Sequence, residues 1–318
     1  MNQLPALERH PAPAMPHMAR IHYPRVVLQL FWRMRIDLLV MVLLCLLLHL
    51  VCPLDVDNAL VTSGSQATLG IAVSVFLAFR NTQAINRWWE ARSLWGGVVN
   101  QSRTWRDTLL TELPLAQVSA PAVHAPESQR LLQLQVLLVW LLNFELRGHG
   151  PRELRQRVLA LAAGLGFAAD VTLQQACCER ALALNRLLAH NLVSDLGKDA
   201  LLRSLAAFHD AAGGLQKIRN TPIPVPYDAF VRLIAWLYGA ELFINLHDSG
   251  KPWVGAVVFF GFLVAERIAA YVEGPFDWDP PSFSLPLNQI CLGISDDLLG
   301  RDSPFAAAPR CYDPSIWT

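Results

Sequence analysis

The feature that most constrains the fold is a nearly uncharged apolar run, IDLLVMVLLCLLLHLVC, at residues 36–52. Such a run is typical of a helix that crosses a lipid bilayer, which needs about 20 apolar residues, and we expect the helix to extend backward through Leu28 to Trp32. The composition agrees, since 53% of the 318 residues are hydrophobic and only 16% are charged. This is too apolar for an ordinary soluble domain of this size, so part of the chain is expected to lie in lipid.

Three further segments have the composition of membrane helices. Residues 229–246 and 253–272 are separated by HDSGKP, a polar turn whose glycine and proline predict a helical hairpin. Residues 59–79 carry several hydroxyl and amide side chains among small apolar ones, so this helix is expected to face protein or water rather than lipid. The hairpin helices also contain charges, which indicates that one face of each looks inward; these charges are Arg232, Glu241, Glu266 and Arg267.

Basic residues predict the orientation of these spans. Arginines and lysines gather before the first span, after the second and before the third, whereas the short turns on the other side carry only Lys251. Because cytosolic loops are enriched in basic residues, both termini are expected in the cytoplasm, with the chain integral to a cell or inner membrane. Overall charge is balanced at 26 basic and 26 acidic residues, and no basic run with interleaved aromatics suggests a nucleic-acid partner.

About 145 residues lie between the second and third spans, which is far more than a connecting loop needs. Their helical periodicity predicts five helices, the first continuing straight from the second span; the ranges are 87–110, 127–146, 152–165, 171–192 and 198–212, the last stopping at Gly213 and Gly214. The stretch 127–146 could pass for a span. Its polar residues, which include Gln135 and Asn143, favour a buried core helix instead.

These patterns predict an all-α polytopic membrane protein with four transmembrane helices and a cytosolic helical domain. The expected organisation has five parts along the chain: a flexible cytosolic tail at 1–19, the first two membrane helices within 20–80, the cytosolic helical domain at 81–220, the third and fourth membrane helices within 221–273, and an acidic segment with a C-terminal cytosolic helix and tail at 274–318.

The most specific signal is LAFRNTQAINRWWEARSLWGGVVNQSRTWR at residues 77–106. It resembles the bestrophin family of ion channels, whose prokaryotic members show the same succession of Phe-Arg-Asn, Arg-Trp-Trp-Glu and Leu-Trp-Gly. TPIPVPY at 221–227, YVEGPFDW at 271–278 and LNQICLGISDDLL at 287–299 fall where that family would have them. The resemblance therefore covers roughly residues 20–300.

The resemblance implies a homopentamer with one pore on the five-fold axis, lined mainly by the second span. Its expected partners are other copies of the chain, membrane lipids and permeant monovalent ions. Eukaryotic relatives are typically calcium-activated anion channels, whereas cation selectivity is also known among bacterial relatives. That precedent and the acidic pore exit give a slight lean to cations, with an anion-selective channel as the alternative and a non-conducting membrane scaffold as a second alternative. No enzyme is expected, because no catalytic motif such as G-x-S-x-G, a P-loop or H-E-x-x-H is present.

Ile71, Val75 and Phe79 recur every four residues and so form one narrow stripe on the second helix. They correspond to the hydrophobic neck of the family, where a ring of such stripes makes a dry constriction that closes by dewetting. The alternative is a stripe that merely packs against a neighbouring helix. The family also implies a second, cytosolic aperture, for which the candidates on helix 171–192 are Leu184, Leu188 and His190.

Two further groups of residues are singled out by the motifs. Arg87, Trp88, Trp89 and Glu90 lie at the bilayer exit, where they either anchor the pore helix to the cytosolic domain or form an ordinary interfacial aromatic belt. Three carboxylates align with the calcium site of eukaryotic relatives, but calcium prefers about six to eight oxygen ligands. We therefore expect no required cofactor, with calcium as the alternative; the three are Glu273, Asp277 and Asp279.

Overall fold

The computed structural model describes residues 23–51, 63–112, 125–189, 193–277, 283–300 and 303–305. Within these ranges all regular structure is helical, which confirms the predicted all-α class. The helices are α1 (Tyr23–Arg33), α2 (Arg35–Val51), α3 (Ser63–Glu112), α5 (Ala125–Arg147), α6 (Arg152–Gly164), α7 (Leu173–Ala189), α8 (Asp195–Asn220), α9 (Val225–Asp248), α10 (Pro252–Val272) and α11 (Leu287–Leu299). The predicted tail at 1–19 lies outside the described residues, as do residues 306–318 of the predicted C-terminal segment 274–318.

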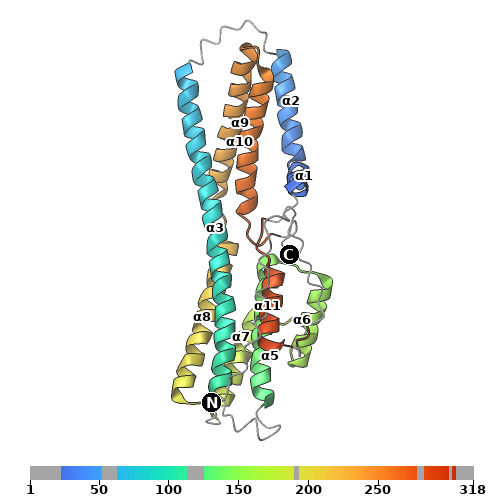
Figure 1. Cartoon of the computed structure of the whole chain (residues 1–318), viewed down its shortest axis with the longest axis vertical. Coiled ribbons are helices and arrows are strands. Elements are labelled where there is room, and N and C mark those ends of the chain that lie inside the picture. Colours follow the sequence, from blue (N-terminus) through green and yellow to red (C-terminus); the bar gives the residue numbers. More distant parts are fainter. Residues whose placement is uncertain are drawn as a thin grey trace, which may run out of the picture.

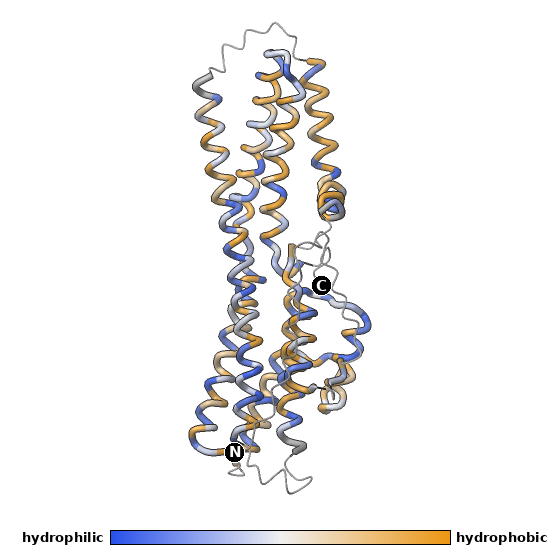
Figure 2. The backbone as a smooth tube through the Cα atoms, viewed as in Figure 1, coloured by the Kyte–Doolittle hydropathy of each residue, from blue (hydrophilic) through white to orange (hydrophobic). Residues whose placement is uncertain are grey.

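The molecule is long and consists of two helical bundles joined end to end (Figure 1). The upper bundle contains α2, α9, α10 and the first half of α3, and the lower bundle contains α5, α6, α7, α8, α11 and the second half of α3. Hydrophobic residues dominate the helices of the upper bundle, whereas the lower bundle alternates between apolar and polar residues (Figure 2). This division matches a membrane part and a part outside the membrane.

By length and composition, α3, α9 and α10 could each cross a membrane, and α1 with α2 passes the same test as a bent pair. The predicted hairpin is confirmed as α9 and α10, although α9 begins earlier than expected, at Val225. Pro224 precedes its first residue and Pro226 lies in its first turn, where the missing N–H has no intrahelical partner to lose.

The first span does not extend backward as one straight helix, because the chain bends by 64° between α1 and α2, although the two helices together have the length and composition of a span. Met34 lies at the break and is buried with Met41, Phe243 and Phe259 in the core of the upper bundle. The bend keeps Arg33 and Arg35 at the end of the apolar layer, where the Arg33 guanidinium lies 4.1 Å from the ring centre of Tyr271. A straight helix would carry both charges along the apolar span, at a high desolvation cost.

Helix α3 runs without interruption for 50 residues, which confirms that the second span continues into the lower bundle. In the upper bundle Val73 and Leu77 are buried with Val231 of α9. In the lower bundle the same helix contributes Trp95 and Trp105 to the main core. One rigid element therefore belongs to both bundles.

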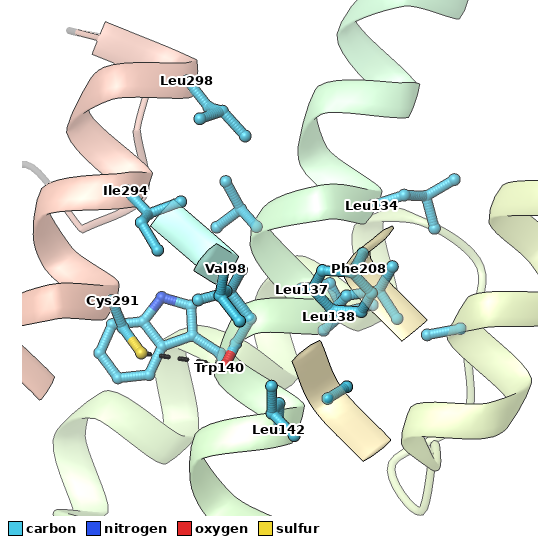
Figure 3. Close-up of a cluster of buried hydrophobic side chains, with 14 of the residues drawn as sticks. Val98, Leu134, Leu137, Leu138, Trp140, Leu142, Phe208, Cys291, Ile294 and Leu298 are labelled. Atoms are coloured by element: carbon cyan, nitrogen blue, oxygen red, sulfur yellow. Dashed lines mark hydrogen bonds between the residues drawn. The ribbon is translucent and has the colours of Figure 1, made fainter. Parts of the chain in front are cut away.

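The lower bundle is organised around α5, whose prediction as a buried core helix is confirmed. Trp140 of α5 packs toward α11 (Figure 3). Its indole N–H donates to Ser295 Oγ at 3.0 Å. Two polar residues of α5 donate hydrogen bonds inside the core: Gln135 to Ser102 Oγ at 3.0 Å, and Asn143 to the Asn288 amide oxygen at 2.8 Å. Paired amides of this kind are tolerated in a core because their hydrogen bonds replace those to water.

Arg180 of α7 is a charged residue buried inside the lower bundle. Its guanidinium carbon lies 5.3 Å from the ring centre of Trp105 and 4.7 Å from that of Phe208, and it donates to the side-chain oxygen of Gln135. Burial lowers the pKa of Arg180 to about 10, which leaves it charged at neutral pH. Its charge is thus stabilised by aromatic faces from α3 and α8.

The predicted stop of the fifth helix at Gly213 and Gly214 is wrong, because α8 continues through both glycines to Asn220. A side chain at position 214 would begin only 2.9 Å from Leu94 Cδ1, so the glycine permits a close approach of α8 to α3. Tertiary packing outweighs the intrinsic cost of two helical glycines, about 1 kcal/mol each. At the other end Ser194 caps α8 by accepting the Gly197 N–H at 3.0 Å.

The close contact between α9 and α10 yields a test. A Cβ added at Gly255 would lie 2.9 Å from the backbone Cα of Phe243, whereas one added at Gly261 on the same helix would meet nothing within 4 Å. We expect Gly255→Ala to destabilise the purified protein by about 1–3 kcal/mol, since backbone cannot yield as a side chain can.

The matched control, Gly261→Ala, should be neutral or slightly stabilising. Thermal unfolding in detergent would compare the two variants with the parent. Equal midpoints for both variants would contradict the close hairpin contact.

Candidate functional site: the exposed face of helix α3

The three residues assigned to the neck lie exposed on the protomer surface. Ile71, Val75 and Phe79 are 67%, 45% and 59% exposed, whereas Val73 and Leu77 on the opposite side of α3 are buried. The stripe therefore does not pack into the core of its own chain. That it lines a pore stays a prediction for experiment.

Exposure alone also fits lipid contact, as the exposed leucines of α2 illustrate. What distinguishes α3 is the continuation of its exposed face, since Thr82, Gln83 and Asn86 follow Phe79 and are exposed as well. Exposed amides and hydroxyls are costly in hydrocarbon and suit water or a partner subunit. The face of α3 thus changes from apolar to polar along its length, as a neck opening into an aqueous vestibule requires.

Directly after Phe79, Arg80 turns inward and is almost completely buried. Its guanidinium donates to Glu266 Oε1 of α10 at 2.5 Å and also pairs with Asp228 in the first turn of α9. Glu266 is 0% exposed and accepts two further bonds from Arg267, at 2.5 and 2.7 Å. Helix α3 is therefore tied to both helices of the hairpin directly after the apolar stripe.

The charges extend to the remaining helix of the upper bundle. Asp37 of α2 accepts a hydrogen bond from Arg232 of α9 at 2.6 Å and lies 3.9 Å from Arg267 Nη1. Three arginines and three carboxylates thus connect α2, α3, α9 and α10. Charged side chains in a membrane bundle need such mutual pairing, because water does not compensate them there. We call these six residues the charge network.

The Arg-Trp-Trp-Glu motif at residues 87–90 holds α3 at the junction between the two bundles. Arg87 donates to the carbonyl oxygens of Glu273 at 3.0 Å and Thr221 at 2.6 Å, and to that of Ile218. Trp88 donates its indole N–H to the Phe283 carbonyl at 2.7 Å. Carbonyls at helix C-termini lack intrahelical partners, so one arginine here satisfies the ends of α8 and α10 together. The sequence left open whether these residues form an anchor or an aromatic belt, and it did not indicate contacts with backbone carbonyls.

The other two residues of this motif differ from Arg87 and Trp88 in their exposure to the surface. Trp89 and Glu90 are exposed, and the Trp89 ring contacts that of Trp88 edge-on with 5.1 Å between ring centres. These two residues remain candidates for contact with a neighbouring subunit, with lipid headgroups or with the vestibule.

The acidic segment does not fit a calcium site in the part that the structure describes. Glu273 uses its carboxylate to accept the Ile223 N–H at 3.1 Å, and Asp277 lies exposed at the end of a described stretch. Asp279 lies outside the described residues, and among the described ones no group of three or more acidic, histidine or cysteine residues could hold a metal. Calcium usually needs about six to eight oxygens, so the described residues supply too few.

The candidates for the cytosolic aperture are not supported. Leu184 is 1% exposed inside the lower core, so its side chain cannot face an opening, and Leu188 packs partly buried against the same core. The reason is the helical period, because α7 uses this side to contact α5. His190 falls in the stretch 190–192, of which the structure describes nothing.

The architecture defines an all-helical membrane protein with an exposed apolar stripe on a long central helix. Residues 7–300 match the family model described as Bacterial/Fungal Bestrophin protein. The chain belongs to this family, which confirms the resemblance found in the sequence, and it is an integral membrane protein.

Individual relatives agree with this assignment. The "Voltage-dependent anion channel-forming protein RSc3414" of Ralstonia nicotianae is 30% identical over 253 residues, covering 74% of this chain and 76% of the relative. A protein of the same description from Synechocystis, sll1024, is 28% identical and covers 72% and 74%. Among solved structures, a single-site variant of a bacterial bestrophin homologue from Klebsiella pneumoniae is similar with a TM-score of 0.68 and 25% identity, covering 84% of this chain and 98% of that one.

The charge network predicts a strong effect of neutralising its buried acid. We expect Glu266→Gln to destabilise the protein by about 3–5 kcal/mol, because Arg80 and Arg267 would remain buried with one carboxylate fewer between them. Thermal unfolding in detergent or lipid nanodiscs would measure the change.

Asp199→Asn is the control, since it removes an ion pair with Arg203 whose side chains are both exposed. Such a surface pair contributes about 0.2–1 kcal/mol. A loss at Glu266 no larger than that at Asp199 would refute the role given to the charge network.

Proposed function

We propose that this chain forms an anion-conducting channel whose narrowest part is a ring of Ile71, Val75 and Phe79. The observation that carries the proposal is the exposed apolar stripe on α3, backed by a buried face and followed by exposed polar residues. Several copies arranged about an axis would bring the stripes together and remove them from lipid. Such a neck holds water poorly, so small changes in its width switch conduction on and off.

Five copies are proposed because the bestrophin resemblance implies a pentamer. The lower bundle would then lie in the cytoplasm with both termini, and the upper bundle in a cell or inner membrane. The arginines beside the bend between α1 and α2 support this orientation, since basic residues accumulate at the cytosolic face. Mass measurement of the purified complex would test the subunit number.

The choice of anion rests on the relatives. The two named above are called voltage-dependent anion channel-forming proteins, which favours the anion alternative over the initial lean to cations. The neck itself carries no charge and does not discriminate by sign, so selectivity would arise from charges in the vestibules. The acidic segment that suggested cations is partly engaged in structure, because Glu273 accepts a backbone N–H.

The decisive experiment is a planar-bilayer recording with purified protein under a potassium chloride gradient. A reversal potential near that of chloride supports the proposal, and one near that of potassium restores the cation reading. Absence of current from well-incorporated, correctly assembled protein would refute the channel and favour a non-conducting membrane scaffold. We also propose that conduction needs no calcium, so chelating calcium on both sides should leave the current unchanged.

Shortening one neck residue tests the pore assignment. We expect Val75→Ala to raise the single-channel conductance, because a smaller side chain widens the constriction and eases its wetting. Val42→Ala is the matched control, since Val42 is 55% exposed on α2 and lies off the proposed pathway. Identical currents from both variants would mean that the α3 stripe serves packing rather than permeation.

A further inference from the structure

Two histidines face each other at the end of the upper bundle remote from α11 and the lower bundle. His49 lies in the last turn of α2 and His247 in the last turn of α9. His49 Nδ1 is 2.7 Å from His247 Nε2, and the two ring centres are 4.8 Å apart. His247 is 4% exposed, whereas His49 is exposed, so the pair lies at the surface of the bundle with one ring held inside.

The arrangement of the two nitrogens is that of two ligands directed at one point. In neutral imidazole one ring nitrogen carries hydrogen and the other offers a lone pair. In the hydrogen-bonded pair one of the facing nitrogens must donate. If the hydrogen of that ring moves to its other nitrogen, both facing nitrogens present lone pairs toward the space between them, which is the state that binds a metal ion.

We infer that His49 and His247 form a two-histidine site for a divalent transition-metal ion, with Zn²⁺ as the best fit. Imidazole suits zinc, copper and nickel, whereas calcium and magnesium prefer oxygen ligands. The last turns of two helices add favourable electrostatics, because the helix dipole places partial negative charge at each C-terminus.

The required movement is small. Zinc–nitrogen bonds of about 2.0–2.1 Å in a tetrahedral arrangement separate two ligand nitrogens by roughly 3.3 Å. The nitrogens of His49 and His247 would therefore move apart by several tenths of an ångström, which side-chain rotation of the exposed His49 can supply. Among the described residues no third histidine, cysteine or carboxylate completes a cluster, so water would fill the remaining positions and the affinity would be moderate.

Binding there would add a metal-held contact between α2 and α9 to the packing of Met41 and Cys45 in the upper core. The other end of α2 is joined to α9 through the ion pair of Asp37 with Arg232. A metal ion at His49 and His247 would fix the same two helices at their far ends, so that α2 could no longer move against the hairpin. An effect on current rests on the proposed channel function, whereas binding itself does not.

The test uses full-length protein freed of any polyhistidine tag and stripped with a chelator, titrated with Zn²⁺ by calorimetry. We expect one ion per chain, and His49→Asn should weaken binding by on the order of 10–100-fold, a loss that even the outer partners of metal ligands cause. His209→Asn is the control, since His209 is exposed on α8 and bonded to the Leu205 carbonyl.

A second variant guards against a folding artefact. The double substitution His49→Cys with His247→Cys should retain zinc binding, because thiolates are also good zinc ligands. No binding by the parent, or equal binding by the parent and His49→Asn, would overturn the site.

Bilayer recordings with Zn²⁺ added to one side at a time separate this proposal from the channel proposal. A change of current from one side only, absent in His49→Asn, supports regulation. Zinc binding in a protein that never conducts would leave the metal site standing and the channel function refuted.

Discussion

The burial of charge inside the upper bundle is the constraint on which the rest of this structure depends. Arg80 and Glu266 are both withdrawn from solvent, and an isolated ion in such surroundings would cost several kcal/mol. The pair is tolerable only when α3, α9 and α10 come together with Asp228 and Arg267 at hand. Because Arg80 follows Phe79 directly, the ion pairs that compensate the buried charge of Arg80 also fix the position of the apolar stripe along the hairpin.

A second set of contacts fixes the junction of the two bundles. Arg87 lies two helical turns beyond Arg80 on α3 and holds the carbonyl ends of α8 and α10 through Ile218 and Glu273. Unlike the charge network, this arginine pairs with dipoles rather than with carboxylates. Ion pairs thus position the stripe within the membrane, and backbone caps position the membrane part on the lower bundle.

The spans of the hairpin, the core helix α5 and the uninterrupted α3 could be predicted from sequence, because hydropathy and helical period depend on local residues alone. The break at Met34 could not, since it reflects where Arg33 and Arg35 meet the edge of the apolar layer. Gly214 predicted a stop, yet its close approach to Leu94 makes it a packing residue.

For the candidate site, periodicity found the exposed stripe on α3. Leu184 was misassigned because period alone does not identify which face a neighbouring helix covers. The ion pair between Arg80 and Glu266 joins residues 186 positions apart in the chain, so no local pattern could indicate it.

The length of α3 has a mechanical consequence. At 1.5 Å per residue its 50 residues form a rod of roughly 75 Å. If this stiff rod pivots near Arg80 and Arg87, a tilt of about 5° moves its lower end by roughly 3–4 Å. Arg87 and Arg80 lie partway along this rod and act as its fulcrum. A movement of the lower end of α3 would therefore also move the apolar stripe, while the hydrogen bonds of the helix stay intact.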